Sequence, residues 1–115
     1  MMIGFEEFKK MDIRIASITN VQDHPDADKL YLITAEIGKG TDGAKTEKTF
    51  VAGIKKYYTK EELIGKQIVV LTNLEPAVIR GVTSDCMLLA ASDKDKKNLA
   101  VITTDKTIDI GSKVS

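Results

Sequence analysis

The sequence from Asn73 to Ala91 reads N-L-E-P-A-V-I-R-G-V-T-S-D-C-M-L-L-A-A. It begins where one apolar run, Gln67 to Thr72, ends, and it closes in a second apolar run, Cys86 to Ala91. Both runs have the composition of buried strands. Between them lies a polar loop that contains a rigid proline and a permissive glycine. Two buried strands that hold out a polar loop are a common way to build a binding site, although an ordinary hairpin connection has the same pattern.

The periodicity of apolar residues before Gln67 predicts the other strands of the domain. Strands are expected over three further ranges: Asp12–Val21, Lys29–Ile37 and Lys48–Ile54. The segment T-K-E-E-L begins at Thr59 and has Glu62 at the third position after the cap, which predicts a capping box and a helical turn. Five strands with a helical turn between the third and fourth follow the order of an OB-fold, an all-β Greek-key barrel. This fold often binds oligonucleotides, but fold alone does not determine function.

Two terminal segments are additions to the five strands. Gly4 to Met11 is expected to be a short helix, because Phe5 and Phe8 share one face with Met11. Thr107 to Val114 is expected to be a tail. The barrel needs neither segment to close. Their apolar faces therefore either cover the ends of their own barrel or meet a second copy of the chain.

Length and composition are those of one domain spanning residues 1–115, with 43% hydrophobic and 30% charged residues. No apolar run approaches the roughly 20 residues of a membrane helix. Glu6 and Glu7 stand where a signal peptide would be apolar, so a cytoplasmic location is expected. Cys86 is the single cysteine, which excludes an internal disulfide and fits a reducing compartment.

Charge is balanced overall but polarised along the chain. Seventeen basic residues oppose seventeen acidic ones. From Ala44 to Lys60, five lysines accompany the single acid Glu47, a net charge of +4. From Val21 to Leu30 the net charge is −2. The basic segment indicates either a phosphate-binding surface or a solvated lysine face.

Catalytic and metal-binding patterns are weak. Cys86 and His24 are a nucleophile and a base in principle, but Cys86 lies in an apolar run, where a buried inert thiol is expected, and His24 precedes a proline in an acidic turn. Asp26 and Asp28 join His24 without a cysteine or a second histidine, too few groups for a typical zinc site. We therefore expect no enzyme activity, no metal and no cofactor.

Five segments of the chain occur in the same order as in one known family. They are D-I-R-I-A-S-I from Asp12, H-P-D-A-D-K-L-Y from His24, V-A-G-I from Val51, E-E-L-I-G-K from Glu61 and N-L-E-P-A-V-I-R-G-V-T-S-D-C-M-L-L-A from Asn73. Together they resemble the tRNA-binding domain appended to methionyl-tRNA synthetases. Similar domains occur in the endothelial-monocyte-activating cytokine family, the yeast synthetase cofactor family and stand-alone structure-specific tRNA-binding proteins. The resemblance covers about residues 5 to 114.

The resemblance implies a tRNA-binding protein: the free-standing beta subunit of a methionyl-tRNA synthetase, or a general tRNA-binding cofactor. Its implied partners are tRNA and an aminoacyl-tRNA synthetase catalytic subunit, with no membrane contact. Proteins of this kind that stand alone are typically homodimers through terminal additions. The alternative, from another class, is a dimeric secretion chaperone that binds polypeptide with the same barrel.

The residues that the resemblance places against RNA are Arg14, Lys29, Asn73, Arg80, Ser84 and Met87. Arginine pairs with phosphate through a forked geometry, asparagine and serine bond base edges or ribose, and methionine packs on a base. Each also has a structural interpretation: Asn73 closes a turn, Ser84 caps the loop, Met87 is core, and Arg14 pairs with Asp12 or Asp28.

Two positions depart from the family pattern, because Glu75 and Val78 stand where many members carry lysine. Lysines of the basic segment are expected to compensate if the barrel brings them to the same face. They are Lys45, Lys48, Lys55 and Lys56, of which the last three are predicted to contact RNA.

Overall fold

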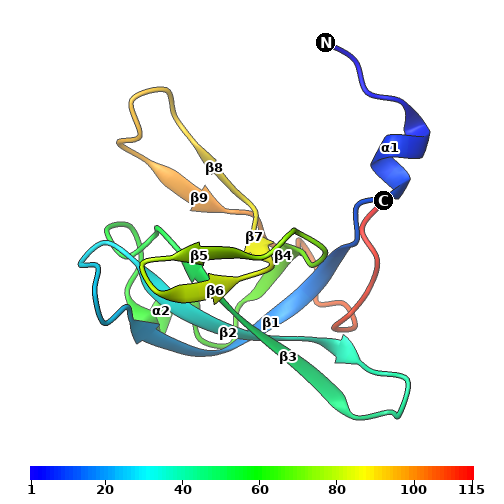
Figure 1. Ribbon diagram of the computed structural model, residues 1–115, viewed down its shortest axis with the longest axis horizontal. Coiled ribbons are helices and arrows are strands. Elements are labelled where there is room, and N and C mark those ends of the chain that lie inside the picture. Colours follow the sequence, from blue (N-terminus) through cyan, green and yellow to red (C-terminus); the bar gives the residue numbers. More distant parts are fainter.

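The computed structural model describes all 115 residues. Two short helices and nine strands follow one another along the chain (Figure 1). Their bounds are α1 (Phe5–Lys9), β1 (Ile13–Asp23), β2 (Tyr31–Lys39), β3 (Lys45–Ala52), α2 (Lys60–Leu63), β4 (Gln67–Leu71), β5 (Ala77–Ile79), β6 (Val82–Ser84), β7 (Met87–Leu88), β8 (Ala90–Ser92) and β9 (Leu99–Val101). Neither helix has the length or apolarity needed to cross a membrane.

The main sheet is antiparallel, with the strand order β3-β2-β1-β4-β7. Its central strand, β1, pairs with β4 through Ile13–Ser17 and with β2 from Ser17 onward. The register of β1 against β2 shifts between Ile18 and Asn20, and such a bulge bends a strand and increases its twist. The sheet curls until β3 lies beside β6 and β7 without a shared ladder. This curled half-barrel confirms the predicted all-β, OB-like fold class.

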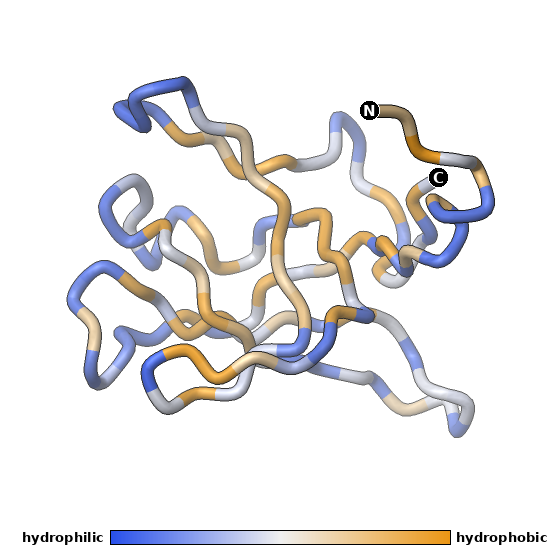
Figure 2. The backbone as a smooth tube through the Cα atoms, turned by 45° about the horizontal axis from the view of Figure 1, so that its top comes forward, coloured by the Kyte–Doolittle hydropathy of each residue, from blue (hydrophilic) through white to orange (hydrophobic).

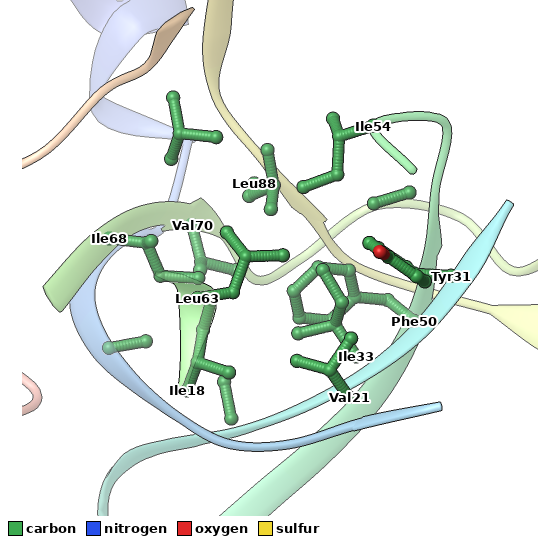
Figure 3. Close-up of a cluster of buried hydrophobic side chains, with 14 of the residues drawn as sticks. Ile18, Val21, Tyr31, Ile33, Phe50, Ile54, Leu63, Ile68, Val70 and Leu88 are labelled. Atoms are coloured by element: carbon green, nitrogen blue, oxygen red, sulfur yellow. The ribbon is translucent and has the colours of Figure 1, made fainter. Parts of the chain in front are cut away.

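The main core fills the inside of the curled sheet. Figure 3 shows Phe50 of β3 among side chains from β1 and β2, with Leu63 of α2 projecting into the same cluster. The predicted capping box is present: Thr59 Oγ1 accepts from the backbone N–H of Glu62 at 3.3 Å, and the Glu62 carboxylate accepts from the Thr59 N–H at 2.8 Å. The cap matters because a helix of four residues does not form alone, so α2 persists by burying Leu63.

A second, smaller core lies on the opposite face of β1 and β4. It contains Ile13, Ile15 and Val69, which are covered by Phe8 of α1 and Val114 of the tail. Alternate residues of a strand face opposite sides, so Ile13 and Ile15 point away from the barrel interior. The predicted terminal segments therefore cover their own barrel in part. Both chain ends lie on the same side of the molecule, beside α1 (Figures 1 and 2).

The tail forms backbone hydrogen bonds with β1, as an additional strand would. The Ile15 N–H donates to the Ser112 carbonyl at 2.9 Å, and the Gly111 N–H donates to the Ile15 carbonyl at 2.7 Å. At this crossing Gly111 has a φ of +92° and packs against the backbone of Gly38 in β2. Two glycines in contact let the two backbones approach closely.

The stretch from Asn73 to Ala91 contains the hairpin connection considered as an alternative, and it differs from the prediction in its last strand. The polar loop is a hairpin, β5–β6, whose two-residue turn, Arg80-Gly81, has positive φ at both positions (51° and 86°), as in the tight turns that match strand twist. The predicted strand Cys86–Ala91 is divided, because β7 pairs with β4 whereas β8 pairs with β9. Periodicity does not show the change of partner, since both halves are apolar.

Substitution of Gly111 by alanine should destabilise the fold strongly. The added Cβ would lie 2.9 Å from the Gly38 Cα and 3.2 Å from the Ile37 carbonyl oxygen. Backbone atoms cannot move aside cheaply, so we expect a loss of about 3 kcal/mol in the free energy of unfolding, measured by urea denaturation.

Gly43→Ala is the matched control. Gly43 also has positive φ, at 80°, but nothing lies within 4 Å of its added Cβ. It should therefore cost only the backbone strain, about 1 kcal/mol. Equal losses for the two variants would show that the crossing of Gly111 over Gly38 carries no special constraint.

Candidate nucleic-acid interface

The predicted site residues do not form one cluster. The β5–β6 hairpin runs along the barrel (Figure 1); Arg80 is in its turn, and Asn73 lies in the connection between β4 and β5. Arg14 lies near the start of β1, on the side of Asn73, whereas Lys29 lies in the turn that follows the end of β1. Some candidate residues therefore lie at opposite ends of the molecule, and others lie at the seam where the barrel closes.

At the first end, Arg14 and Asn73 are engaged by the junction between α1 and β1. The Arg14 Nε donates to Asp12 Oδ1 at 2.9 Å, and this bond is the main cause that holds the pKa of Asp12 below its ordinary value. Asn73 accepts from the Asp12 N–H at 2.9 Å and donates to the Lys10 carbonyl at 2.7 Å. Arg14 thus has the pairing with Asp12 that its structural interpretation predicts, whereas Asn73 bonds to a distant junction of the chain instead of closing its own turn. Only the two terminal nitrogens of Arg14 remain without a partner in the chain.

Where the barrel closes, Ser84 and Lys48 have structural contacts. Ser84 is buried, its hydroxyl donating to the Cys86 carbonyl at 3.2 Å and accepting from the Val51 N–H at 3.4 Å. The Lys48 ammonium lies 3.2 Å from Asp85 Oδ2. These bonds join β3 to the end of β6 and to Asp85 just after it, although β3 and β6 share no ladder. The structural interpretation of Ser84 is therefore observed, because its hydroxyl is buried and already has two hydrogen-bond partners.

At the second end, Arg80 and Lys29 are exposed and take part in no ion pair of the structure. They line an open cleft of about 440 Å³ between the hairpin tip and the turn after β1, together with Asp26, Asp28 and neighbouring residues. Unpaired cations on either side of a cleft are suited to an anionic group. Lys29 and Arg80 are thus predicted RNA contacts without an ion-pair partner, in a cleft that also carries the carboxylates of Asp26 and Asp28.

A second basic group flanks the same turn. The carboxylate of Asp23, the last residue of β1, lies 3.1 Å from the Lys55 ammonium and 3.2 Å from that of Lys60. Hydrogen bonds from Lys55 and then Lys60 lower the pKa of Asp23. The Lys56 ammonium lies over the Tyr57 ring, 5.8 Å from its centroid. An open cleft of about 370 Å³ adjoins these lysines.

Lys60 is a member of this group that the predicted contacts do not include, although it belongs to the basic segment. The sequence pattern assigns it only to the helical turn, where it is the first residue of α2. Its proximity to Asp23 depends on the barrel, so no local pattern indicates it.

The net charge of the basic segment is largely neutralised by acids from elsewhere in the chain. Lys45 pairs with Glu36, Lys48 with Asp85, and Lys55 and Lys60 with Asp23. Only Lys56 of this segment has no carboxylate partner. Exposed ion pairs contribute at most about 1 kcal/mol each. A phosphate therefore replaces such a carboxylate at little cost.

Met87 lies at the seam between β3 and β7 and is 42% exposed. It lines a small apolar pocket of about 280 Å³ with residues that include Val51, Leu88 and Leu99. The exposed thioether is free to pack against a flat apolar group such as a base. Met87 is thus not plain core, the alternative considered for it.

The structure offers no reactive centre at the one cysteine. Cys86 is buried, and burial raises the pKa of its thiol to about 11. The thiol is therefore protonated near neutral pH and is a poor nucleophile. The expectation of a buried inert thiol is confirmed. No group of three or more histidine, cysteine or acidic side chains is placed to hold a metal ion.

Comparisons with known proteins agree on one family. The family model described as "Putative tRNA binding domain" matches residues 13–113. A methionine–tRNA ligase of Nanoarchaeum equitans is 48% identical over 113 residues, which make up 98% of this chain and 14% of the ligase. The chain thus spans about one seventh of the length of such relatives.

Solved structures show the same fold over the whole chain. A methionyl-tRNA-synthetase-related protein from Pyrococcus horikoshii superposes with a TM-score of 0.86 at 25% identity, covering 100% of this chain and 99% of that one. The chaperone CsaA from Bacillus anthracis superposes with a TM-score of 0.82 at 27% identity, covering 100% of both chains.

Removing the Asp23 carboxylate should strengthen polyanion binding. Asp23→Asn frees Lys55 and Lys60 from their internal partner. We expect later elution from a heparin column at neutral pH, because more positive charge is then available to neutralise the ligand.

Glu6→Gln is the control, because it changes net charge equally at the exposed Glu6–Lys9 pair of α1. It should leave the elution salt concentration nearly unchanged. If the two variants shift elution equally, the effect comes from net charge alone and the Asp23 site is not part of the interface.

Proposed function

The chain belongs to the tRNA-binding domain family, and from this premise we propose that it supplies tRNA affinity to a methionyl-tRNA synthetase through the end of the barrel that carries the turn between β1 and β2. The observation that carries the site assignment is the gathering of cations around this turn. Lys29 and Arg80 flank one side and Lys55, Lys56 and Lys60 the other.

Binding at this end is electrostatic and reads the shape of the RNA. Lys29, Arg80 and Lys56 meet phosphates directly, whereas Lys55 and Lys60 exchange the Asp23 carboxylate for phosphate. Phosphate contacts position a nucleic acid without reading its sequence. A single-stranded base packs on Met87 at the seam of the barrel, as unstacked bases do in RNA complexes. Arg14 contributes through its free terminal nitrogens at the far end of β1.

The catalytic step belongs to the partner in this proposal. The matched region makes up 14% of the ligase, and the family it represents is a binding domain. We propose that this chain acts as a tRNA-binding subunit beside a methionyl-tRNA synthetase catalytic module, in the cytoplasm, without enzymatic activity of its own. Its contribution is a lower KM for tRNA, because binding energy far from the reacting atoms raises the concentration of bound tRNA.

A polypeptide-binding chaperone is the second candidate, favoured by the similarity to the chaperone CsaA. It predicts binding of an unfolded polypeptide rather than tRNA. The free cations at the turn between β1 and β2 support the nucleic-acid function instead.

The terminal segments support a homodimer. All residues of α1 remain at least partly exposed, and five residues are too few for a helix to persist alone. Phe5 is 71% exposed, Ile3 57% and Ile108 50%. A small groove of about 190 Å³ runs between α1 and the tail, lined by residues that include Phe5 and Val114. A second copy would cover this surface and place two tRNA-binding ends in one particle, which raises avidity without new contacts.

Arg80→Ala should weaken tRNA binding about tenfold, because one charge-assisted phosphate contact is lost. The salt dependence of log affinity should become shallower by about 0.7 to 0.9, the contribution of one phosphate. Fluorescence titration with total tRNA at several salt concentrations measures both. The melting temperature should stay nearly constant, because the Arg80 side chain is exposed.

Lys106→Ala serves as the matched control, since Lys106 is exposed and unpaired but lies in the tail region. An Arg80→Ala affinity equal to that of Lys106→Ala would reject this site. Binding of denatured polypeptide in place of tRNA by the unaltered chain would favour the chaperone function.

Light scattering at micromolar concentration should give twice the 12.6 kDa mass of one chain. The double substitution Phe5→Glu with Ile3→Glu should return the mass to one chain while the barrel stays folded, because both side chains are exposed within the protomer. A single-chain mass for the unaltered protein would reject the dimer.

A further inference from the structure

His24, the residue that follows β1, is buried and uses both of its ring nitrogens. Nδ1 lies 3.0 Å from the backbone nitrogen of Asp26, and Nε2 lies 3.2 Å from the carbonyl oxygen of Ile79. Because the Asp26 N–H donates to Nδ1, that nitrogen carries no proton. Nε2 then holds the ring proton and donates it to the Ile79 carbonyl, which can only accept. The two backbone partners thus fix which ring nitrogen accepts and which donates.

The bond to Ile79 fixes a hairpin that has few other attachments. The β5–β6 pair is a separate two-stranded sheet, and all three residues of β5 are exposed. Ser84 attaches the base of the hairpin to β3. At the tip, the His24–Ile79 bond is the only hydrogen bond to the rest of the barrel. An isolated two-stranded hairpin is marginally stable in water, so its tip depends on this bond.

The same imidazole also orders the turn that carries Lys29. Its Nδ1 accepts from the Asp26 N–H and closes the turn, which is also held by the backbone N–H of His24 donating to the Leu30 carbonyl at 3.1 Å. Arg80 follows directly after Ile79, so one side chain connects the two loops that bear the free cations. Those loops form the two walls of the cleft between Arg80 and Lys29.

We propose that His24 is a positioning residue for RNA binding: it fixes the distance between Arg80 and Lys29 so that both reach the same stretch of phosphate backbone. This inference rests on the proposed function. Fixing the cations before binding saves the entropy of ordering a mobile hairpin during association. The role of His24 is therefore distinct from contact with RNA, since the buried ring does not reach the ligand.

Two conservative substitutions separate the two bonds of the ring. His24→Asn places a side-chain oxygen near the position of Nδ1 and preserves the turn through Asp26, as asparagine does in turns, but it loses the donor to Ile79. His24→Gln offers an amide donor near the position of Nε2 and preserves the bond to Ile79, while it loses the acceptor for Asp26.

We expect His24→Asn to lower tRNA affinity about five- to tenfold and His24→Gln to remain within about twofold of the unaltered chain, since one lost neutral hydrogen bond is worth about 1 kcal/mol. In an Arg80→Ala background, His24→Asn should have no further effect on affinity, because the cation that it positions is gone. Heteronuclear NOE measurements on the free protein should show increased mobility at residues 79–81 in His24→Asn only.

The outcomes are distinct. If the unaltered chain does not bind tRNA, the proposed function fails and this inference fails with it. If the unaltered chain binds but His24→Asn and His24→Gln lose affinity in proportion to their loss of melting temperature, His24 has only a stabilising role. Additive losses of affinity from His24→Asn and Arg80→Ala would equally overturn the positioning role.

Discussion

The backbone hydrogen bonds of β1 are the constraint on which the rest of the molecule depends. The eleven residues of β1 pair with β4 along the first half of the strand and with β2 along the second half. The tail also forms backbone hydrogen bonds with Ile13 and Ile15. Because β2 and β4 share β1 over different lengths, the sheet must curl, and the bulge near Thr19 supplies the bend. The ends of β1 then become the two polar regions of the molecule, one organised by Asp12 and the other by Asp23 and His24.

Local patterns in the sequence are sufficient to predict the barrel. Alternation identifies the long strands, and the Thr59–Glu62 spacing identifies the capping box, because each depends on residues close together in the chain. The β5–β6 hairpin resembles a loop in the sequence because β5 is fully exposed and the one buried residue of β6 is the polar Ser84, so no alternation of apolar residues marks these strands. The division of the last apolar run at Leu89 is hidden for a related reason, since hydrophobicity does not say which strand will be the partner.

The candidate site is less predictable, because its charges and hydrogen bonds join distant parts of the chain. The lysines from Ala44 to Lys60 suggest a strongly basic surface, but after folding three of them pair with the two carboxylates of Asp23 and Asp85. Ser84 is a candidate because its hydroxyl can bind RNA, yet in the structure this hydroxyl accepts a hydrogen bond from the Val51 N–H of β3. The bond from His24 to Asp26 fits the prediction of a turn residue. The bond from His24 to Ile79, 55 residues away, cannot be inferred from sequence spacing.

Both chain ends emerge together beside α1, whereas the cations gather around the turn between β1 and β2 (Figure 1). This separation has a consequence for modularity. Another polypeptide joined before α1 or after the tail would leave the barrel away from the basic end and would not obstruct it. The fold is therefore suited to attachment to larger assemblies from either terminus, and a linker of modest length would let the attached module and the barrel approach different parts of one RNA molecule.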